Sequence, residues 1–257
     1  MFTLAVTPEV NLVLTVLLIV WAALLCGGFV LGRPKAGTPQ PPPRWTWLAS
    51  SMVLVVAAWG WVFLVNYTTL ANNGRFANDT TELSAFGYAL LIAIGMTLGF
   101  VGDIFMARQN VMGGISAFGL GHIAYIAGLL WFSDAVGLND SAIRLGAWVT
   151  WLIIGVIAWF ITVYRGQQHT VLTWAALAYC LLLSSTAGFA TGLAMQRSEF
   201  MPLALGTMLF LFSDLLITVQ LFMQKRFRLM DDLIWLTYGP AQALIVYSVY
   251  AALVVVS

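Results

Sequence analysis

Residues 84–107 read SAFGYALLIAIGMTLGFVGDIFMA, and this stretch decides what kind of protein the chain is. It is longer than the roughly 20 apolar residues that a helix needs to cross about 30 Å of hydrocarbon. Its only charged residue is Asp103, which lies near its end. An apolar run with a single acidic side chain predicts a transmembrane helix that carries a functional group.

The rest of the chain repeats this apolar pattern. Of the 257 residues, 61% are apolar and only 8% are charged, whereas soluble domains carry about 25% charged residues. A soluble surface cannot be built from so few charges. We therefore predict an all-α, polytopic bundle of eight transmembrane helices that forms a single integral-membrane domain over residues 1–257. The predicted spans are about 9–32, 46–66, 84–107, 113–132, 143–164, 171–194, 200–224 and 233–256.

Charge and cysteine content exclude several classes of protein. A net charge of +1 and a pI near 7.8 lack the strongly basic footprint of a nucleic-acid-binding protein. Cys26 and Cys180 both lie inside apolar runs, so the sequence predicts no disulfide framework and no zinc cluster. We expect no nucleic-acid partner, no metal and no cofactor.

The basic residues predict the orientation in the membrane, because Lys and Arg concentrate in cytoplasmic loops. The eight basic residues of the odd-numbered loops outnumber the three on the other face. This distribution places the odd-numbered loops in the cytoplasm and both termini outside. The first group is Arg33, Lys35, Arg44, Arg108, Arg165, Lys225, Arg226 and Arg228, and the second is Arg75, Arg144 and Arg197.

Pairs of glycines predict where helices pack closely, since a G-x-x-x-G spacing lets two backbones approach in lipid. The pairs are Gly28 with Gly32, Gly95 with Gly99, and Gly188 with Gly192. Gly99 shares a helix face with Asp103, four residues further on. We therefore expect Asp103 to face another helix and not the lipid.

Two acidic residues lie deep inside predicted spans. Asp103 lies about 7 Å along its helix from Arg108, and Asp214 lies about 16 Å from Lys225. A charged carboxylate at such a depth costs at least about 3 kcal/mol, so these residues normally face a cavity or a partner and mark function. The alternative is that each carboxyl group only hydrogen-bonds a neighbouring helix.

Other polar side chains are expected at a similar depth. His122 and Tyr125 share one face of the fourth span, and Tyr238 and Gln242 share one face of the eighth, which Pro240 should kink. Counted from the predicted cytoplasmic ends, these residues and the two aspartates lie in the cytoplasmic half of the membrane, which predicts one polar cavity. Alternatively, His122 is a satisfied core histidine, and Tyr238 and Gln242 are simple interhelical hydrogen-bonding residues.

This set of residues limits the chemistry. The chain has only two histidines, so a three-histidine zinc hydrolase is excluded, and it has no G-x-S-x-G nucleophile elbow. Two carboxyl groups in one low-dielectric cavity cannot both ionise cheaply, so one is expected to stay protonated near neutral pH. Glycosidases use such a pair to donate a proton and to stabilise an oxocarbenium ion, and an enol ether needs the same help.

Four short motifs, in order along the chain, resemble the YhhN-like lysoplasmalogenase family of eight-helix membrane proteins. The resemblance covers roughly residues 45–257. The motifs are Phe100-Val-Gly-Asp103 with Ile104-Phe-Met, Gly121-His-Ile-Ala-Tyr125, Phe212-Ser-Asp214-Leu-Leu-Ile and Thr237-Tyr-Gly-Pro-Ala-Gln242.

The resemblance implies hydrolysis of the vinyl ether bond of lysoplasmalogens, which yields a fatty aldehyde and a glycerophospho-base. Asp103 and Asp214 would be the acid and the stabilising carboxylate, in either assignment. His122 would position water or tune the acidity of a carboxyl group, and Tyr125, Tyr238 and Gln242 would bind the substrate.

The expected partners are the lysophospholipid substrate and membrane lipids, and homo-oligomers stay open. The expected location is the bacterial inner (plasma) membrane. Two other functions stay open at this point. A proton-coupled transporter would use the same two aspartates to carry protons, and a non-catalytic lipid-binding or assembly factor would use the cavity without chemistry.

Overall fold

The computed structural model describes residues 8–31, 44–71, 80–165 and 170–256, which are almost entirely helical and contain no strand. Each of the eight long helices contains a segment long and apolar enough to cross a membrane. This confirms the predicted all-α fold with eight spans. The helices are α1 (Pro8–Leu31), α2 (Arg44–Ala71), α3 (Thr80–Ala107), α4 (Val111–Ala135), α5 (Ser141–Trp159), α6 (Val171–Gln196), α7 (Met201–Phe222) and α8 (Met230–Val256).

Several helix ends differ from the predicted spans. Helix α2 continues to Ala71 and α3 already begins at Thr80, beyond the apolar runs. Apolar residues mark the part of a helix that matches the hydrocarbon, whereas a helix can continue with polar residues outside it. The last turn of the fifth span is a π-helix, η1 (Phe160–Tyr164), and a short 3₁₀ turn, η2 (Ser198–Phe200), leads into α7. Hydropathy carries no signal for either turn.

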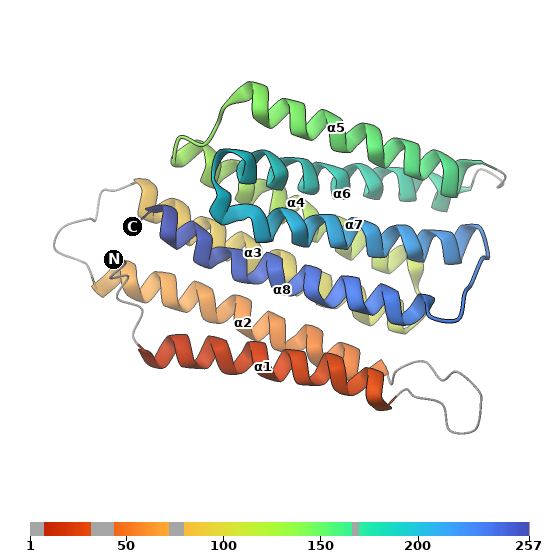
Figure 1. The fold of residues 1–257 in the computed structure, drawn as a ribbon, viewed down its shortest axis with the longest axis horizontal. Coiled ribbons are helices and arrows are strands. Elements are labelled where there is room, and N and C mark those ends of the chain that lie inside the picture. The colour runs from red at the N-terminus through yellow and green to blue at the C-terminus, as the bar shows by residue number, and fades with distance from the viewer. Residues whose placement is uncertain (1–7, 32–43, 72–79, 166–169, 257) are drawn as a thin grey trace.

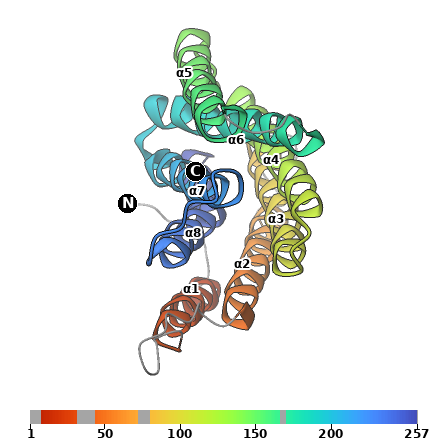
Figure 2. The ribbon, with the colours of Figure 1, turned by 90° about the vertical axis from the view of Figure 1, so that its right-hand side faces the viewer.

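Five helices surround the interior of the bundle. Helices α3, α4, α6, α7 and α8 contact one another in a closed ring, and α2 packs against both α3 and α8. Figure 2 shows this ring end-on, with α1 and α5 outside it at opposite sides of the bundle. These outer helices are also the least buried, with 22% of the α1 span and 28% of the α5 span buried, against 61% for α8. They therefore present most of their surface to the surroundings.

Glycines mark the close helix contacts. A Cβ added to Gly188 would lie 2.6 Å from the Cα of Trp148, and one added to Gly192 would lie 3.2 Å from the Cα of Arg144. The close approach predicted for this pair is confirmed, and its partner helix is α5. Gly95 accommodates the ring of Tyr125, which would lie 2.2 Å from an added Cβ. Of the remaining pair, Gly32 lies outside the described residues.

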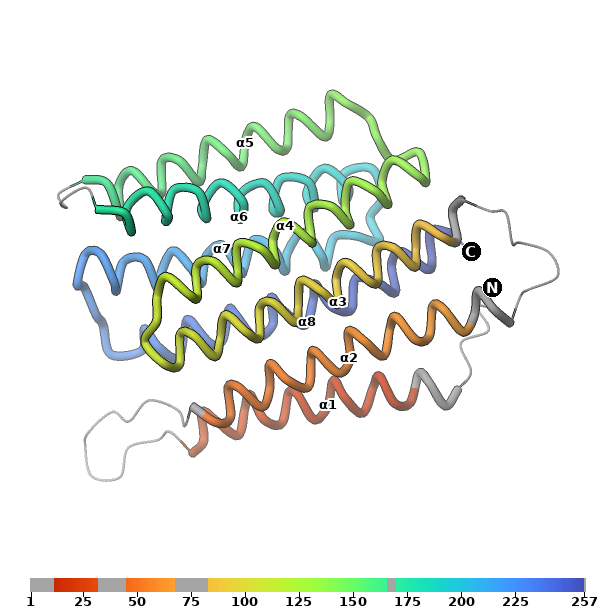
Figure 3. The backbone as a smooth tube through the Cα atoms, turned by 180° about the vertical axis from the view of Figure 1, so that it is seen from behind, coloured from red at the N-terminus to blue at the C-terminus, as the bar shows by residue number. Residues whose placement is uncertain are grey.

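Successive helices run in opposite directions, so the described connections alternate between two ends of the bundle (Figures 1 and 3). The α3–α4 and α7–α8 connections lie at one end, where Arg108, Lys225, Arg226 and Arg228 are exposed. The start of α1 and the end of α8 lie at the other end. The orientation across the membrane stays a prediction, and three of the basic residues on which it rests, Arg33, Lys35 and Arg75, lie outside the described residues.

Candidate functional site

A cavity of about 310 Å³ opens between α2, α3, α7 and α8, at the end of the bundle that carries the α7–α8 connection. Asp103, Asp214 and Tyr238 all line it, although they come from three different helices. Gln220 and Asp231 line it at the ends of α7 and α8. The two aspartates of the sequence motifs are thus brought to one cavity, as their depth along the chain predicts.

Asp103 is held by side chains from two other helices. It is only 7% exposed, and the hydroxyl group of Tyr238 on α8 donates to its Oδ1 over 2.7 Å. Its Oδ2 makes a short hydrogen bond with Ser51 of α2. Gln242 completes a ring, because its Oε1 lies 3.0 Å from Ser51 Oγ and its Nε2 donates to the Tyr238 oxygen over 2.6 Å. The carboxyl group is therefore fixed in position and faces other helices, as predicted.

This ring has four hydrogen-bonded contacts between four side chains. When Asp103 is an ionised carboxylate, only three hydrogens are available, one each from the serine hydroxyl, the tyrosine hydroxyl and the amide N–H. One of the four contacts then joins two oxygens without a hydrogen between them. Turning the Gln242 amide round does not change this count. Every contact holds one hydrogen when the Asp103 carboxyl group is protonated, because it then supplies the fourth. The geometry of the ring therefore fits a neutral Asp103.

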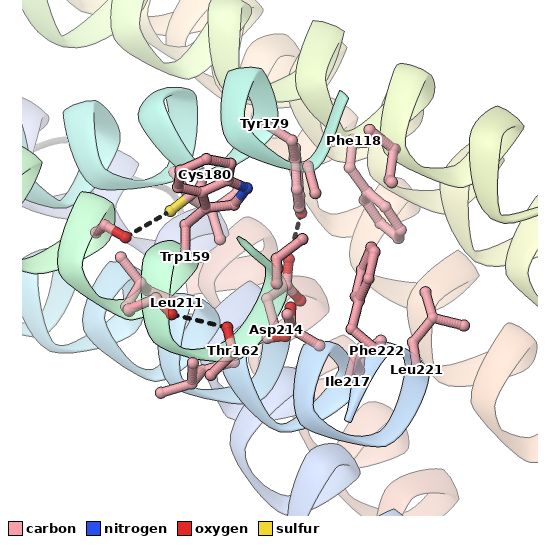
Figure 4. Close-up of a pocket in the computed structure, with 18 of the residues that line it drawn as sticks. Phe118, Trp159, Thr162, Tyr179, Cys180, Leu211, Asp214, Ile217, Leu221 and Phe222 are labelled. Carbon is pink, nitrogen blue, oxygen red and sulfur yellow. Dashed lines mark hydrogen bonds between the residues drawn. The ribbon is translucent and has the colours of Figure 1, made fainter. Parts of the chain in front are cut away.

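Asp214 has a different set of neighbours. The hydroxyl group of Tyr179 on α6 makes a short hydrogen bond to its Oδ2 (Figure 4). Ser213 Oγ lies 3.5 Å from its Oδ1, but this hydroxyl already donates to the carbonyl of Phe210 over 2.9 Å. Tyr179 has a hydrogen to give and Asp214 only has to accept it. The two carboxyl groups thus occupy chemically distinct environments on the same cavity wall.

His122 lies behind this wall and is not among the residues that line the cavity. Its Nδ1 is 3.0 Å from the Thr186 hydroxyl, which already donates to the carbonyl of Leu182. The imidazole therefore donates from Nδ1, and its buried Nε2 has no hydrogen-bond partner. The ring packs edge-on against Phe210, with 4.9 Å between centroids, and against Tyr179.

Tyr125 also lies away from the cavity. It is 4% exposed, and its ring packs edge-on against His122 and fills the space above Gly95. Of the sequence-predicted site residues, Asp103, Asp214 and Tyr238 line the cavity, and Gln242 contacts Tyr238 from just behind it. His122 and Tyr125 form an inner layer that packs against the site.

Sequence reasoning missed one partner of each aspartate, Ser51 of Asp103 and Tyr179 of Asp214. Both residues are polar and lie inside apolar spans, and this position could have identified them as candidate site residues. Sequence reasoning also missed a stacked aromatic pair on the cavity wall, Trp47 and Trp235, whose ring centroids are 4.4 Å apart. The position of both residues near helix ends could have indicated this pair.

An ion pair lies at the mouth of the cavity. Arg226 bonds the carboxylate of Asp231 over 2.9 Å, and Gln220 Nε2 donates to the same carboxylate over 2.9 Å. All three residues line the cavity. The mouth thus presents both charges, whereas the interior presents two carboxyl groups and a phenol. Within the described ranges, histidine, cysteine and acidic residues form no group of three that could hold a metal ion.

Comparison with known proteins places the chain in a family. Residues 61–249 match the YhhN family, and this segment includes all four sequence motifs and both aspartates. It is somewhat shorter than the 45–257 expected from the resemblance, and Ser51 lies outside it. No curated protein and no solved structure matches the chain.

Proposed function

The chain belongs to the YhhN family, and from this premise we propose that it hydrolyses the vinyl ether bond of alkenyl lysophospholipids. The products are a fatty aldehyde and a glycerophospho-base. The observation that carries the proposal is the pair of carboxyl groups, Asp103 and Asp214, on the wall of one cavity with unlike hydrogen-bond partners. Such a pair suits a reaction that needs a proton donor and an anion at once.

Asp103 is the proton donor in this mechanism, because the ring that holds it has a hydrogen for every contact only when its carboxyl group is neutral. It transfers its proton to the alkenyl carbon beyond the one bonded to oxygen, and the C=C electron pair forms the new C–H bond. The result is an oxocarbenium ion. Asp214 faces the developing positive charge as a carboxylate, and Tyr179 orients it by hydrogen bonding.

Water then completes the reaction. Its oxygen adds to the carbon that carries the positive charge, and the proton that it loses replaces the one given by Asp103. The resulting hemiacetal breaks its bond to the glycerol oxygen, which takes the hydroxyl proton, and an aldehyde is left. One water molecule is consumed, and both carboxyl groups return to their starting states.

The cavity also supports selectivity for this bond. Ester hydrolysis needs a nucleophile or an activated water together with an oxyanion hole. The described residues that line the cavity include no serine, cysteine or histidine, and the His122 ring packs against Tyr179 and Phe210 outside this lining. We expect the 1-acyl and saturated 1-alkyl analogues to stay intact.

The cavity mouth suits the head group. Arg226 can pair with a phosphate and Asp231 with an amine, so that a zwitterionic group replaces the ion pair that they form with each other. Tyr238 and Gln242 position Asp103, and His122 and Tyr125 support the wall from behind. We further propose that the protein resides in the bacterial inner membrane with this mouth at the cytoplasmic face, as the distribution of basic residues suggests.

Aldehyde release from the purified protein tests the proposal. Wild type and the variants Asp103→Asn and Asp214→Asn are each given 1-alkenyl, 1-acyl and 1-alkyl lysophospholipids. Asp134→Asn is the matched control, because Asp134 pairs with Arg144 at the opposite end of the bundle. We expect aldehyde only from the alkenyl lipid, and only with wild type and the control. Either cavity variant with near-normal activity refutes the mechanism, and a wild type that releases no aldehyde favours a transporter or a lipid-binding factor.

A further inference from the structure

A second, apolar crevice adjoins the carboxylate cavity. It has a volume of about 90 Å³ and lies between α4, the α5–η1 segment, α6 and α7. Asp214, Phe118, Met106 and Ile217 line both the crevice and the cavity, so the two spaces share a wall that includes Asp214. Figure 4 shows Asp214 at the centre of this crevice, with the dashed bond that joins it to Tyr179.

The polar groups of the crevice wall are already engaged. The hydroxyl groups of Thr162 and Thr218 each donate to a backbone carbonyl of their own helix over 2.7 Å. Cys180 Sγ donates to the carbonyl of Gly155 over 3.2 Å, and the Tyr179 hydroxyl is bound to Asp214. Apart from Asp214 itself, the wall therefore offers mainly apolar surface to an occupant, which suits hydrocarbon better than a polar ligand.

The crevice has room for part of a lipid chain, and its lining spans a depth similar to that of one leaflet. Along α7 its lining runs from Leu211 to Phe222, which is a rise of about 16 Å at about 1.5 Å per residue. One leaflet provides about half of the roughly 30 Å of hydrocarbon in a bilayer. Trp159 and Phe222 flank the crevice in a small apolar cluster that also packs against Ala176.

We propose that this crevice binds the hydrocarbon chain of a single-chain lysophospholipid whose head group lies at the mouth of the carboxylate cavity. The inference rests on the proposed function for the identity of the reacting bond. With the chain in the crevice and the phosphate at Arg226, the bond that joins the chain to glycerol lies at the junction, beside Asp214. The two spaces then bind opposite ends of one amphipathic molecule.

Photo-crosslinking tests chain binding without hydrolysis. The probe is a saturated 1-alkyl lysophospholipid with a diazirine in its chain, applied to the whole protein in nanodiscs. We expect labels on crevice residues such as Trp159 and Leu183, and competition by the same lipid without the diazirine. Labels spread over the outer faces of α1 and α5, with none in the crevice, overturn the inference.

Chain-length selectivity provides a second test with a matched pair of variants. Ala176 lines the crevice, whereas Ala178, two residues along the same helix, is exposed outside it. Ala176→Trp should lower kcat/KM for a long-chain alkenyl lysophospholipid by about tenfold, because filling the crevice displaces about two methylene groups. It should leave a short-chain substrate nearly unchanged, and Ala178→Trp should affect neither.

The two proposals fail in different ways. If wild type releases no aldehyde but the probe labels the crevice, the vinyl ether function fails and the chain site stands. If wild type releases aldehyde but Ala176→Trp and Ala178→Trp have equal effects at both chain lengths, the function stands and the chain site fails.

Discussion

Ser51 provides the sharpest test of the hydrogen-bonded ring around Asp103. Its hydroxyl group contacts two side chains from two other helices, Asp103 on α3 and Gln242 on α8. Its neighbour Ser50 is a matched control. Ser51 is 1% exposed and Ser50 is 2% exposed, but the Ser50 hydroxyl group donates only to the carbonyl of Trp47 in its own helix. The variants Ser51→Ala and Ser50→Ala thus delete the same atom at adjacent buried positions.

The expected loss of stability follows from the number of partners. A buried polar group without a partner costs about 1–3 kcal/mol. Ser51→Ala leaves two such groups facing a methyl group, so we expect the free energy of unfolding to fall by about 2–6 kcal/mol. Ser50→Ala removes one local bond, and we expect a fall of about 1 kcal/mol or less.

Activity should follow the same order. Without Ser51 the ring no longer holds Asp103 neutral and in a fixed position, so we expect kcat/KM for the alkenyl lysophospholipid to fall by about 10–100-fold, where about 1.4 kcal/mol corresponds to tenfold. Ser50→Ala should retain near-normal kcat/KM. Unfolding by SDS titration in mixed micelles and aldehyde release measure the two effects. Equal stabilities together with equal activities would refute the account of the ring.

Three further outcomes are expected. Tyr179→Phe should lower kcat by about tenfold or more with the protein still folded, because a hydrogen bond to a charged group contributes about 1.5–3 kcal/mol. Steady-state assays measure kcat, and an unchanged value would count against Asp214 as a carboxylate oriented by Tyr179. Gly188→Ala should destabilise the α5–α6 contact by about 1–3 kcal/mol through overpacking, since its Cβ would lie 2.6 Å from the Cα of Trp148. Gly146→Ala should not, because no atom outside the neighbouring part of its own helix lies within 4 Å of its added Cβ. SDS titration compares the two variants. A C-terminal reporter that works only outside the cytoplasm should be active, and the opposite result would reverse the predicted orientation.

The eight membrane-spanning helices could be predicted from the sequence alone. Whether a segment enters the membrane depends on the summed transfer free energy of its own residues, so each span could be predicted without knowledge of the others. The same reasoning predicted that Asp103 does not face lipid, because an exposed carboxylate at that depth is too costly. Hydropathy could not predict the helix ends or the π-helical turn η1, because apolar residues indicate depth in the membrane and not the pattern of backbone hydrogen bonds.

The partners of the two aspartates were decided by the tertiary structure. Ser51 and Asp103 are 52 residues apart in the chain, and Asp103 and Tyr238 are 135 apart. Whether such side chains meet depends on the rotation and vertical offset of one helix against another, which arise from packing and leave no local trace in the sequence. For the same reason His122, at a depth similar to that of the aspartates, lies behind the cavity wall. Depth in the membrane is a property of one segment, whereas the direction in which a side chain points into the bundle is a property of the whole fold.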